Sequence, residues 1–158
     1  MTKRTERQLL HEVRINAPVE RVWELVSEVR NAPRWSSQAR KVFAVGAGTK
    51  SGTFSVNVNH RGPVVWPTWA RVTDFRPNVR FANEVGMAGA TWVFELERAG
   101  SGESESTLLR QYRDTYYPRE FIAWRLVTPA MGGEGKYNEF MDGNVAESLE
   151  KIKEIAER

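Results

Sequence analysis

The carboxy-terminal segment 136–158 is the feature that most constrains how this chain can fold. Its apolar residues recur every three or four positions, the spacing that places side chains on one stripe of an α-helix. They are Tyr137, Phe140, Met141, Val145, Leu149, Ile152 and Ile155. The opposite face is mostly charged, so the pattern predicts a long helix with one side in water and an apolar stripe that needs a partner surface.

Gly143 is the irregular position of this helix, where glycine costs about 1 kcal/mol relative to alanine. One interpretation is a tolerated glycine or a slight kink. The other is that the missing side chain leaves room for something beside the helix. The residues alone do not decide between them.

Composition narrows the class of protein. A length of 158 residues fits one domain, 1–158, in which we expect residues 1–7 to be flexible. There is no cysteine, which excludes disulfides, thiol catalysis and thiolate metal sites. With only His11 and His60, and no HExxH-like spacing, a histidine-rich metal site is not expected either.

Partners and location follow from charge and hydropathy. The net charge is +3, but Lys and Arg are scattered and no recognised motif accompanies them, so nucleic-acid binding is not expected. No apolar run approaches the roughly 20 residues that span a bilayer, and the first residues lack the apolar core of a signal peptide. We therefore expect a cytoplasmic protein without an integral membrane segment, either a monomer or a homodimer.

Helical periodicity near the start gives way to alternation. Pro18 suits the first turn of a helix, whose apolar side is Val19, Val22, Trp23, Val26 and Val29. A brief second helix or turn follows, and its Trp35 is either a plug between helix and sheet or part of a pocket wall. Alternation predicts strands at 9–15, 41–45, 52–59, 64–75, 79–85, 91–98 and 106–116. Short turns join them, so we expect neighbouring strands to be antiparallel. The apolar segment 118–131 fits a short helix or a lid-like piece.

The order of these elements and four motifs resemble a known superfamily. The motifs are Asn-Ala-Pro-Val-Glu-Arg-Val-Trp at 16–23, Asn-Ala-Pro-Arg-Trp at 31–35, Ala-Thr-Trp-Val-Phe-Glu-Leu-Glu at 90–97, and Asn-Val-Ala-Glu-Ser-Leu-Glu-Lys-Ile-Lys at 144–153. They resemble the START-like, Bet v 1-like (SRPBCC) superfamily in its bacterial polyketide cyclase/dehydrase and lipid-transport branch. The resemblance implies an α+β helix-grip fold: a curved antiparallel sheet of about six or seven strands around the last helix, with short helices between strands 1 and 2.

The resemblance also implies a deep apolar cavity between sheet and helix, with aromatic and a few polar side chains in its wall. Arg71, on a central strand, is the best candidate for a pocket charge and for a catalytic residue, because a guanidinium fork holds a carboxylate, phenolate or enolate. The alternative is that Arg71 lies on the outer face, since Pro67 leaves the strand phase open. The expected ligand-binding residues are Trp35, Phe54, Trp69, Arg71, Trp92, Phe94, Gln111, Arg113, Tyr137, Phe140 and Met141.

Either face of the last strand could point into the cavity. Leu109, Gln111, Arg113 and Thr115 share one face, which matches the polar inward positions of similar proteins, and the alternating residues share the other. The clearer inward set is Trp92, Phe94 and Leu96 on the preceding strand, which core packing alone also explains. Asp74, Glu84, Asp114 and His60 are candidates for proton transfer, but no spacing enforces contact between any two of them.

Three functions remain open. The first is binding of a hydrophobic or aromatic small molecule, polyketide- or lipid-like, without a cofactor or metal. The second is catalysis in the same cavity, as a polyketide aromatase/cyclase or dehydratase acting on a poly-β-ketone. The third is a regulatory or interaction module without a ligand, which would be favoured if the cavity proved to be filled by Trp69, Trp92 and Phe140.

Overall fold

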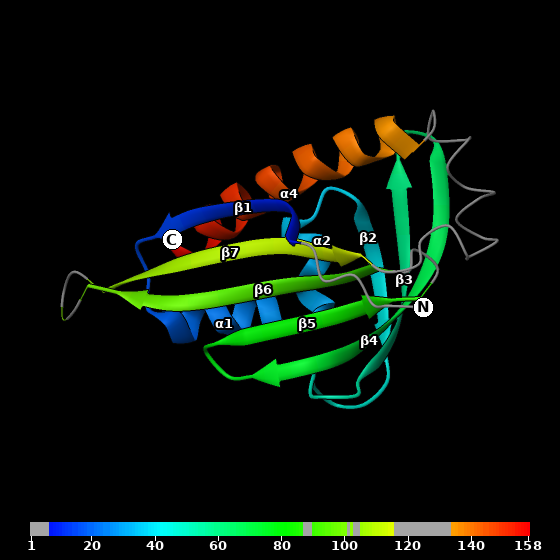
Figure 1. Ribbon diagram of the computed structural model, residues 1–158. Coiled ribbons are helices and arrows are strands. Elements are labelled where there is room, and N and C mark those ends of the chain that lie inside the picture. The colour runs from blue at the N-terminus through cyan, green and yellow to red at the C-terminus, as the bar shows by residue number, and fades with distance from the viewer. Residues whose placement is uncertain (1–6, 87–89, 101, 103–104, 116–133) are drawn as a thin grey trace.

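A seven-stranded antiparallel sheet with a long helix against one face forms the computed structural model of the chain (Figure 1). It describes residues 7–86, 90–100, 102, 105–115 and 134–158. Arg7 already belongs to the first strand. Residues 1–6 and the segment 118–131, for which we expected flexibility and a helix or lid, lie outside the described residues.

The elements follow the order that alternation and helical periodicity predict. The strands are β1 (Arg7–Ile15), β2 (Ala39–Ala44), β3 (Phe54–Arg61), β4 (Val64–Arg76), β5 (Arg80–Val85), β6 (Ala90–Ala99) and β7 (Ser106–Thr115). The helices are α1 (Val19–Ser27), the 3-10 turn η1 (Val29–Asn31), α2 (Ala32–Trp35) and α4 (Glu134–Ala156). The expected α+β helix-grip architecture is confirmed.

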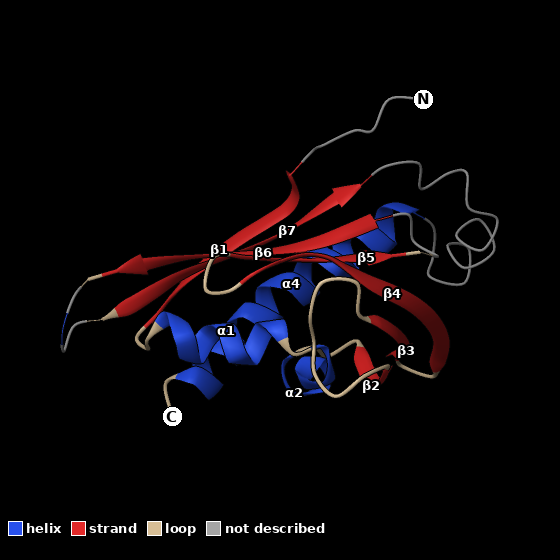
Figure 2. Cartoon of the chain, turned by 90° about the horizontal axis from the view of Figure 1, so that it is seen from below, coloured by secondary structure: helices blue, strands red, loops and turns tan. Residues whose placement is uncertain are grey.

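The sheet is curved and carries its helices on one side. Its strand order is β1-β7-β6-β5-β4-β3-β2, so hairpin neighbours pair from β2 to β7 and β1 closes the other edge against β7. Strands β2 and β3 run steeply across the direction of β5, β6 and β7 (Figure 1), and α1, α2 and α4 all lie beneath the same face (Figure 2). This inner face therefore surrounds α4.

The dry core lies where α1 and the end of α4 meet the inner face of the sheet. Ile15, Val22, Leu109, Leu149 and Ile152 are completely or almost completely buried there. Burying a side chain of this size contributes about 1.5–3 kcal/mol relative to leaving it in water. The core extends through aromatic edge-to-face contacts of Trp23 with Phe75 and Phe81, at ring-centroid distances of 5.1 and 6.5 Å.

Helix α4 buries the stripe that its sequence predicts. Met141, Val145, Leu149 and Ile152 are all buried. Gly143 lies on the exposed face, and a Cβ added there would have no atom within 4 Å. Of the two interpretations of this glycine, the structure supports a tolerated glycine facing solvent.

Within the described part of the chain, no helix combines the length and the apolar character needed to cross a membrane. The same residues contain no cluster of three or more His, Asp or Glu side chains with the proximity needed to hold a metal ion.

Candidate ligand-binding site

A cavity of about 170 Å³ lies between the inner face of the sheet and α1, α2 and α4. For comparison, an engineered cavity of about 150 Å³ binds benzene. Its apolar wall consists of Val26, Val29, Ala32, Trp35, Ala39, Val42, Trp66, Phe81, Val85, Trp92, Phe94, Met141 and Val145. The cavity occupies the part of the inner face that the dry core leaves unfilled.

Neutral polar side chains complete the wall. They are hydroxyls and carboxamides, namely Ser36, Gln38, Asn57, Asn59, Thr68, Asn83, Gln111, Asn144 and Ser148. No Asp, Glu, His, Lys or Arg is among the described residues that line the cavity. The described wall therefore offers hydrogen bonds without an ionisable group.

Several of these polar groups already have partners within the protein. The Asn59 Nδ2 group donates to the Thr68 hydroxyl at 2.9 Å. Asn144 Nδ2 donates to Gln38 Oε1 at 3.1 Å, and Asn144 Oδ1 accepts from the Ser37 hydroxyl. Because Asn144 is on α4 and its partners follow α2, these two bonds attach the helix to the opposite wall of the cavity.

Two carboxamide oxygens in the wall differ from the others. Asn83 Oδ1 on β5 and Gln111 Oε1 on β7 are buried and accept no hydrogen bond from any described residue. A buried polar atom normally has a partner in the protein or in ordered water. The described residues therefore leave the acceptor capacity of these two oxygens unused.

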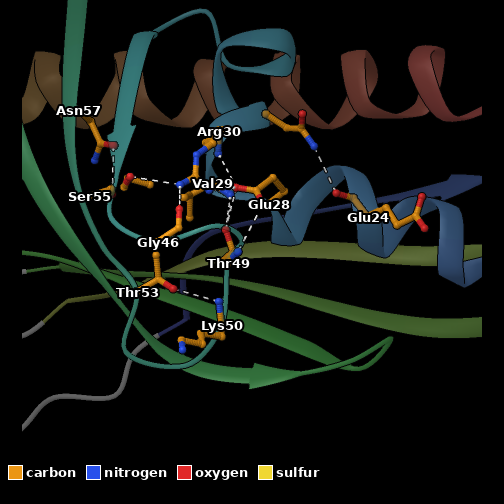
Figure 3. Close-up of polar contacts among 12 residues, drawn as sticks. Glu24, Glu28, Val29, Arg30, Gly46, Thr49, Lys50, Thr53, Ser55 and Asn57 are labelled. Carbon is orange, nitrogen blue, oxygen red and sulfur yellow. Dashed lines mark hydrogen bonds and ion pairs between the residues drawn. The ribbon is translucent and has the colours of Figure 1, made fainter.

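A set of polar bonds holds the turn between α1 and α2 at one end of the cavity (Figure 3). The Glu28 carboxylate accepts from the Thr49 hydroxyl at 2.8 Å and from the backbone N–H of Arg30 at 3.1 Å. The Arg30 guanidinium donates to the carbonyls of Ala44, at 3.1 Å, and Gly46. The loop between β2 and β3 is thereby attached to η1, whose Val29 lines the cavity.

The structure places Trp35, Trp92, Phe94, Gln111 and Met141 in the cavity wall, as expected for ligand-binding residues. The Trp35 ring meets Phe94 edge to face with 5.5 Å between centroids, and its indole N–H donates to the Leu25 carbonyl at 3.2 Å. Trp35 is therefore part of a pocket wall, and a role of these residues in binding stays a prediction.

Two further expected residues, Arg113 and Phe140, lie beside the cavity rather than in its wall. Arg113 is buried on the inner face, paired across the sheet with Trp92. Phe140 is half-buried at the start of α4, and the Arg61 guanidinium lies 4.6 Å from its ring centroid. The side chain of Tyr137 lies outside the described part of the chain.

The expectation that Arg71, Trp69 and Phe54 face the cavity is wrong. Residues 66, 68, 70 and 72 of β4 are buried, and Trp69 and Arg71 alternate with them on the exposed face. Pro67 lies on that outer face without shifting the alternation, and the bulge of the strand comes later, between Val72 and Asp74.

The expectation for Phe54 is wrong for a related reason, because its strand also turns its apolar face outward. On β3 the polar residues Ser55, Asn57 and Asn59 face inward, and the apolar set with Phe54 faces outward. Phe54 stacks on Trp69 with 6.2 Å between ring centroids. The outer face therefore has apolar contacts of its own, so alternation alone does not say which face encloses the cavity.

None of the four candidates for proton transfer lines the cavity. His60 and Glu84 lie on the outer face, where cross-strand pairing places them opposite Val65 and Arg71. Asp114 pairs across the sheet with Thr91. Asp74 belongs to the outer-face ion pairs described next.

Ionisable groups gather on the outer face instead. Asp74 accepts from Arg80 at 2.7 Å and from Arg76 at 2.9 Å, while the Tyr112 hydroxyl donates to Glu95 at 2.6 Å. Burial, followed by the hydrogen bond to Glu95, raises the pKa of Tyr112. The sheet therefore separates a charged outer face from a neutral cavity.

Apart from Gln111, sequence reasoning missed the polar residues of the wall, although a signal for several of them exists. Asn57 and Asn59 occupy every second position of β3, and Asn144 and Ser148 lie within the apolar stripe of α4. Polar residues at core positions are uncommon unless something there bonds them. That pattern marks this cavity together with the aromatic residues.

Solved structures share the fold at low sequence identity. The Zhui aromatase/cyclase from Streptomyces sp. R1128 is 17% identical, with 94% of this chain and 92% of that chain covered and a TM-score of 0.73. Protein XoxI from Bacillus cereus is 15% identical, with 93% of each chain covered and a TM-score of 0.65. The polyketide cyclase-like protein Cgl2372 from Corynebacterium glutamicum is 21% identical, with 94% and 91% covered and a TM-score of 0.58.

The sequence itself matches a family model over nearly its whole length. No curated protein matches it. The family described as polyketide cyclase / dehydrase and lipid transport matches residues 7–157. The chain therefore belongs to the polyketide cyclase/dehydrase and lipid transport family.

Proposed function

We propose that this protein binds a hydrophobic or aromatic small molecule, polyketide- or lipid-like, in the cavity between its sheet and α4. The observation that carries the proposal is the cavity itself: about 170 Å³, walled by aromatic and aliphatic side chains and a few neutral polar groups. Ligand sites in proteins have this composition, with a mainly apolar lining and few polar groups that orient the ligand. A binding role needs no ionisable residue in the wall.

Catalysis as an aromatase/cyclase or dehydratase is the second candidate. The fold shared with an aromatase/cyclase favours it. General acid–base catalysis needs a titratable group within hydrogen-bond reach of the reacting atoms, and the described cavity wall has none. Binding is therefore the better supported of the two.

The ligand-free module is the least supported candidate. A cavity filled by Trp69, Trp92 and Phe140 would favour it. Trp69 lies on the outer face, 39% exposed, and Trp92 borders open volume.

Native mass spectrometry of gently purified protein tests the binding proposal. We expect a bound small molecule at a 1:1 ratio, either co-purified or added as a hydrophobic aromatic compound. Ser148→Leu should lower the occupancy, because Ser148 is buried in the cavity wall. Glu147→Leu is the matched control, since it adds the same side chain one residue away at an exposed position.

Two results would count against the proposal: no 1:1 complex with any hydrophobic aromatic compound, or equal occupancy in both leucine variants. The catalytic candidate has a separate assay. Purified protein that changes the product distribution of a reactive poly-β-ketone would support it, and an unchanged distribution would exclude it for that substrate.

A further inference from the structure

Charge is distributed unevenly along the chain, and the part with β2, β3 and most of β4 is basic. Residues 29–73 contain seven of the 23 Lys and Arg residues and none of the 20 Asp and Glu residues. The remainder of the chain has 16 basic and 20 acidic residues. Lys and Arg are scattered along the sequence, but Asp and Glu are not. The region of β2, β3 and β4 should therefore attract anions, although the whole chain is close to neutral.

An apolar patch lies on the outer face of the same three strands. It consists of Phe43, Val45, Phe54, Val56 and Trp69. Strand pairing places Val56 between Phe43 and Trp69. The Val45 N–H donates to the Phe54 carbonyl at 3.0 Å, and the Phe54 ring stacks on Trp69. Phe43 is 54% exposed and Val45 is 70% exposed, so the patch offers contiguous apolar surface of the kind that marks an interaction site.

The outer face that carries this patch is open and convex. Helices α1, α2 and α4 lie on the other side of the sheet, so no described helix covers the patch (Figure 2). The sheet curves around α4, which makes the outer face bulge outward (Figure 1). Aromatic and aliphatic side chains that project from a convex surface can enter the boundary between lipid headgroups and acyl chains.

Cations border the apolar patch. The Lys41 ammonium lies 5.1 Å from the ring centroid of Phe43. Arg71 is exposed two residues after Trp69, on the same face of β4. Strand pairing places the acidic residue Glu84 opposite Arg71, on the side of β5. The side of the patch formed by β2 and β3 therefore has basic residues alone.

Exposed apolar side chains next to cations have the composition of surfaces that bind anionic membranes. The apolar groups enter the bilayer interface, and the cations attract the lipid headgroups. Nucleic acids are bound differently, because their bases stack on aromatic rings and gain little from exposed valines such as Val45 and Val56. We propose that the outer face of β2, β3 and β4 docks the protein on the surface of an anionic lipid bilayer.

This docking surface lies on the opposite side of the sheet from the cavity. Residues of β3 and β4 that face the cavity alternate with those of the apolar patch, so each strand serves both faces. Membrane docking therefore goes beyond the proposed binding of a small molecule and is tested without a cavity ligand.

Flotation of the full chain with lipid vesicles tests the proposal. Vesicles of phosphatidylcholine alone are compared with vesicles of phosphatidylcholine and phosphatidylserine in equal parts, at about 0.1 M salt. We expect binding to the anionic vesicles to be about tenfold tighter or more, because each cation near the surface adds roughly a fivefold gain. Raising the salt to about 1 M should remove most of this preference, since the Debye length falls from about 10 Å to about 3 Å.

Two glutamate variants locate the contact on the patch. Val45→Glu puts a carboxylate into the patch and should weaken binding to anionic vesicles by about tenfold or more, because the charge opposes both insertion and attraction. Val79→Glu is the matched control, since it makes the same change at a valine that is 53% exposed in the turn after β4. Its binding should stay within about twofold of wild type.

Lys41→Gln separates the contribution of charge from that of apolar contact. It should weaken binding to the anionic vesicles by about fivefold and leave the weak binding to phosphatidylcholine unchanged. Lys41 is exposed, so the substitution removes no buried contact.

Several results would overturn membrane docking. Wild-type protein that does not float with the anionic vesicles excludes it, and equal binding to both kinds of vesicle excludes the role of charge. Equal losses in Val45→Glu and Val79→Glu would show that the patch is not the contact. If labelled poly-glutamate or duplex DNA binds and the anionic vesicles do not, the basic face serves an acidic polymer and the lipid proposal is wrong. The wild-type series decides the matter even if a variant does not fold, and none of these results changes the test of the cavity.

Discussion

Gly86, at the end of β5, lies against the indole of Trp69 on the outer face of the sheet. A Cβ added at Gly86 would stand 1.8 Å from Cζ2 of that indole. The backbone N–H of Gly86 also donates to the Trp69 carbonyl at 3.0 Å, which fixes the two residues side by side. The absence of a side chain at Gly86 is therefore what allows Trp69 to lie flat on the sheet and stack on Phe54.

Gly86→Ala should lower the free energy of unfolding by about 1–3 kcal/mol, because overpacking forces the indole off the sheet. Denaturant unfolding followed by circular dichroism measures this, and tryptophan fluorescence should report greater exposure of Trp69. Gly48→Ala is the control, since a Cβ at Gly48 meets nothing within 4 Å. Equal stability of the two alanine variants would show that the close approach of Gly86 and Trp69 does not contribute to the free energy of unfolding.

At the scale of elements, α4 has one face that packs in the interior and one that is exposed to solvent. Its buried face combines the core residues Leu149 and Ile152 with the cavity residues Met141, Asn144 and Val145. Its other face is open to solvent and includes Gly143, the one interior glycine between residues 136 and 156. The conformational cost of that glycine is not offset by any close contact.

Gly143→Ala should therefore raise the free energy of unfolding by about 0.5–1 kcal/mol, the difference in helix propensity between the two residues. Thermal or denaturant unfolding gives the value. Ligand affinity should not change, because the new methyl group points away from the cavity. A loss of stability, or a loss of binding, would instead mean that the missing side chain serves the site.

The hydrogen bonds of Glu28, which hold η1 against the loop between β2 and β3, make the stability of the fold depend on pH. Burial opposes ionisation of this carboxyl, but the hydrogen bonds from the Arg30 backbone, the Thr49 hydroxyl and the Arg30 guanidinium outweigh it, so the pKa of Glu28 lies below its ordinary value of 4.5. A carboxyl whose pKa is lowered by folding stabilises the protein above its unfolded pKa. That contribution is lost as the pH falls through the lowered pKa of the folded state.

Glu28→Gln should cost about 1–2 kcal/mol at pH 7, since the carboxylate is partly exposed and its bonds are to charged and neutral donors. The difference between the variant and the wild type should shrink as the pH falls below 4.5. Unfolding measured at intervals from pH 7 to pH 3 tests this. Glu20 and Glu157, whose pKa values are also lowered, titrate equally in both proteins and cancel in the comparison. A difference that is independent of pH would exclude the ionised carboxyl as its source.

The strands and the terminal helix were predictable because their periodicity is a local property of the sequence. The orientation of β3 and β4 was not. Alternation separates Asn57 from Val56 and Arg71 from Val72, but it assigns the inside of the sheet only if the apolar set is always buried. Here the amide side chains of β3 line the cavity, and the apolar residues Val56 and Trp69 are each 39% exposed on the outer face.

The site was predictable to the extent that it depends on large side chains. Trp92 and Phe94 lie on the same face of their strand, which is the more apolar of its two faces, and the structure places both in the cavity wall. Gln111 was predicted from the face that it shares with Leu109 and Arg113, whereas the position of Asn83 depends on the pairing of β5 with β6, which no single strand encodes. The neutrality of the described wall depends on the arrangement of several elements, so it emerges only from the folded chain.

At the scale of the molecule, the interior is divided along α4 into a packed end and a hollow end. Leu149, Ile152 and Ala156 join the dry core with Ile15 and Leu109. The preceding turns of the helix border the cavity instead. Stability should therefore come mainly from the packed end, and ligand recognition from the hollow end.

Leu149→Ala tests this division, because Leu149 is 2% exposed and belongs to the packed end. We expect it to lower the free energy of unfolding by about 2–5 kcal/mol, the usual cost of truncating a buried leucine. Ser148→Ala, one residue earlier and in the cavity wall, should cost well under half as much, because it removes one hydroxyl next to open volume and creates no new void in a packed region. Denaturant unfolding gives both values. At temperatures where both variants are folded, Leu149→Ala should bind aromatic probes within about twofold of wild type, because Leu149 is not among the residues that line the cavity. A large loss of affinity in folded Leu149→Ala would mean that the two ends are coupled through α4 and that the hollow end depends on the packing of the core.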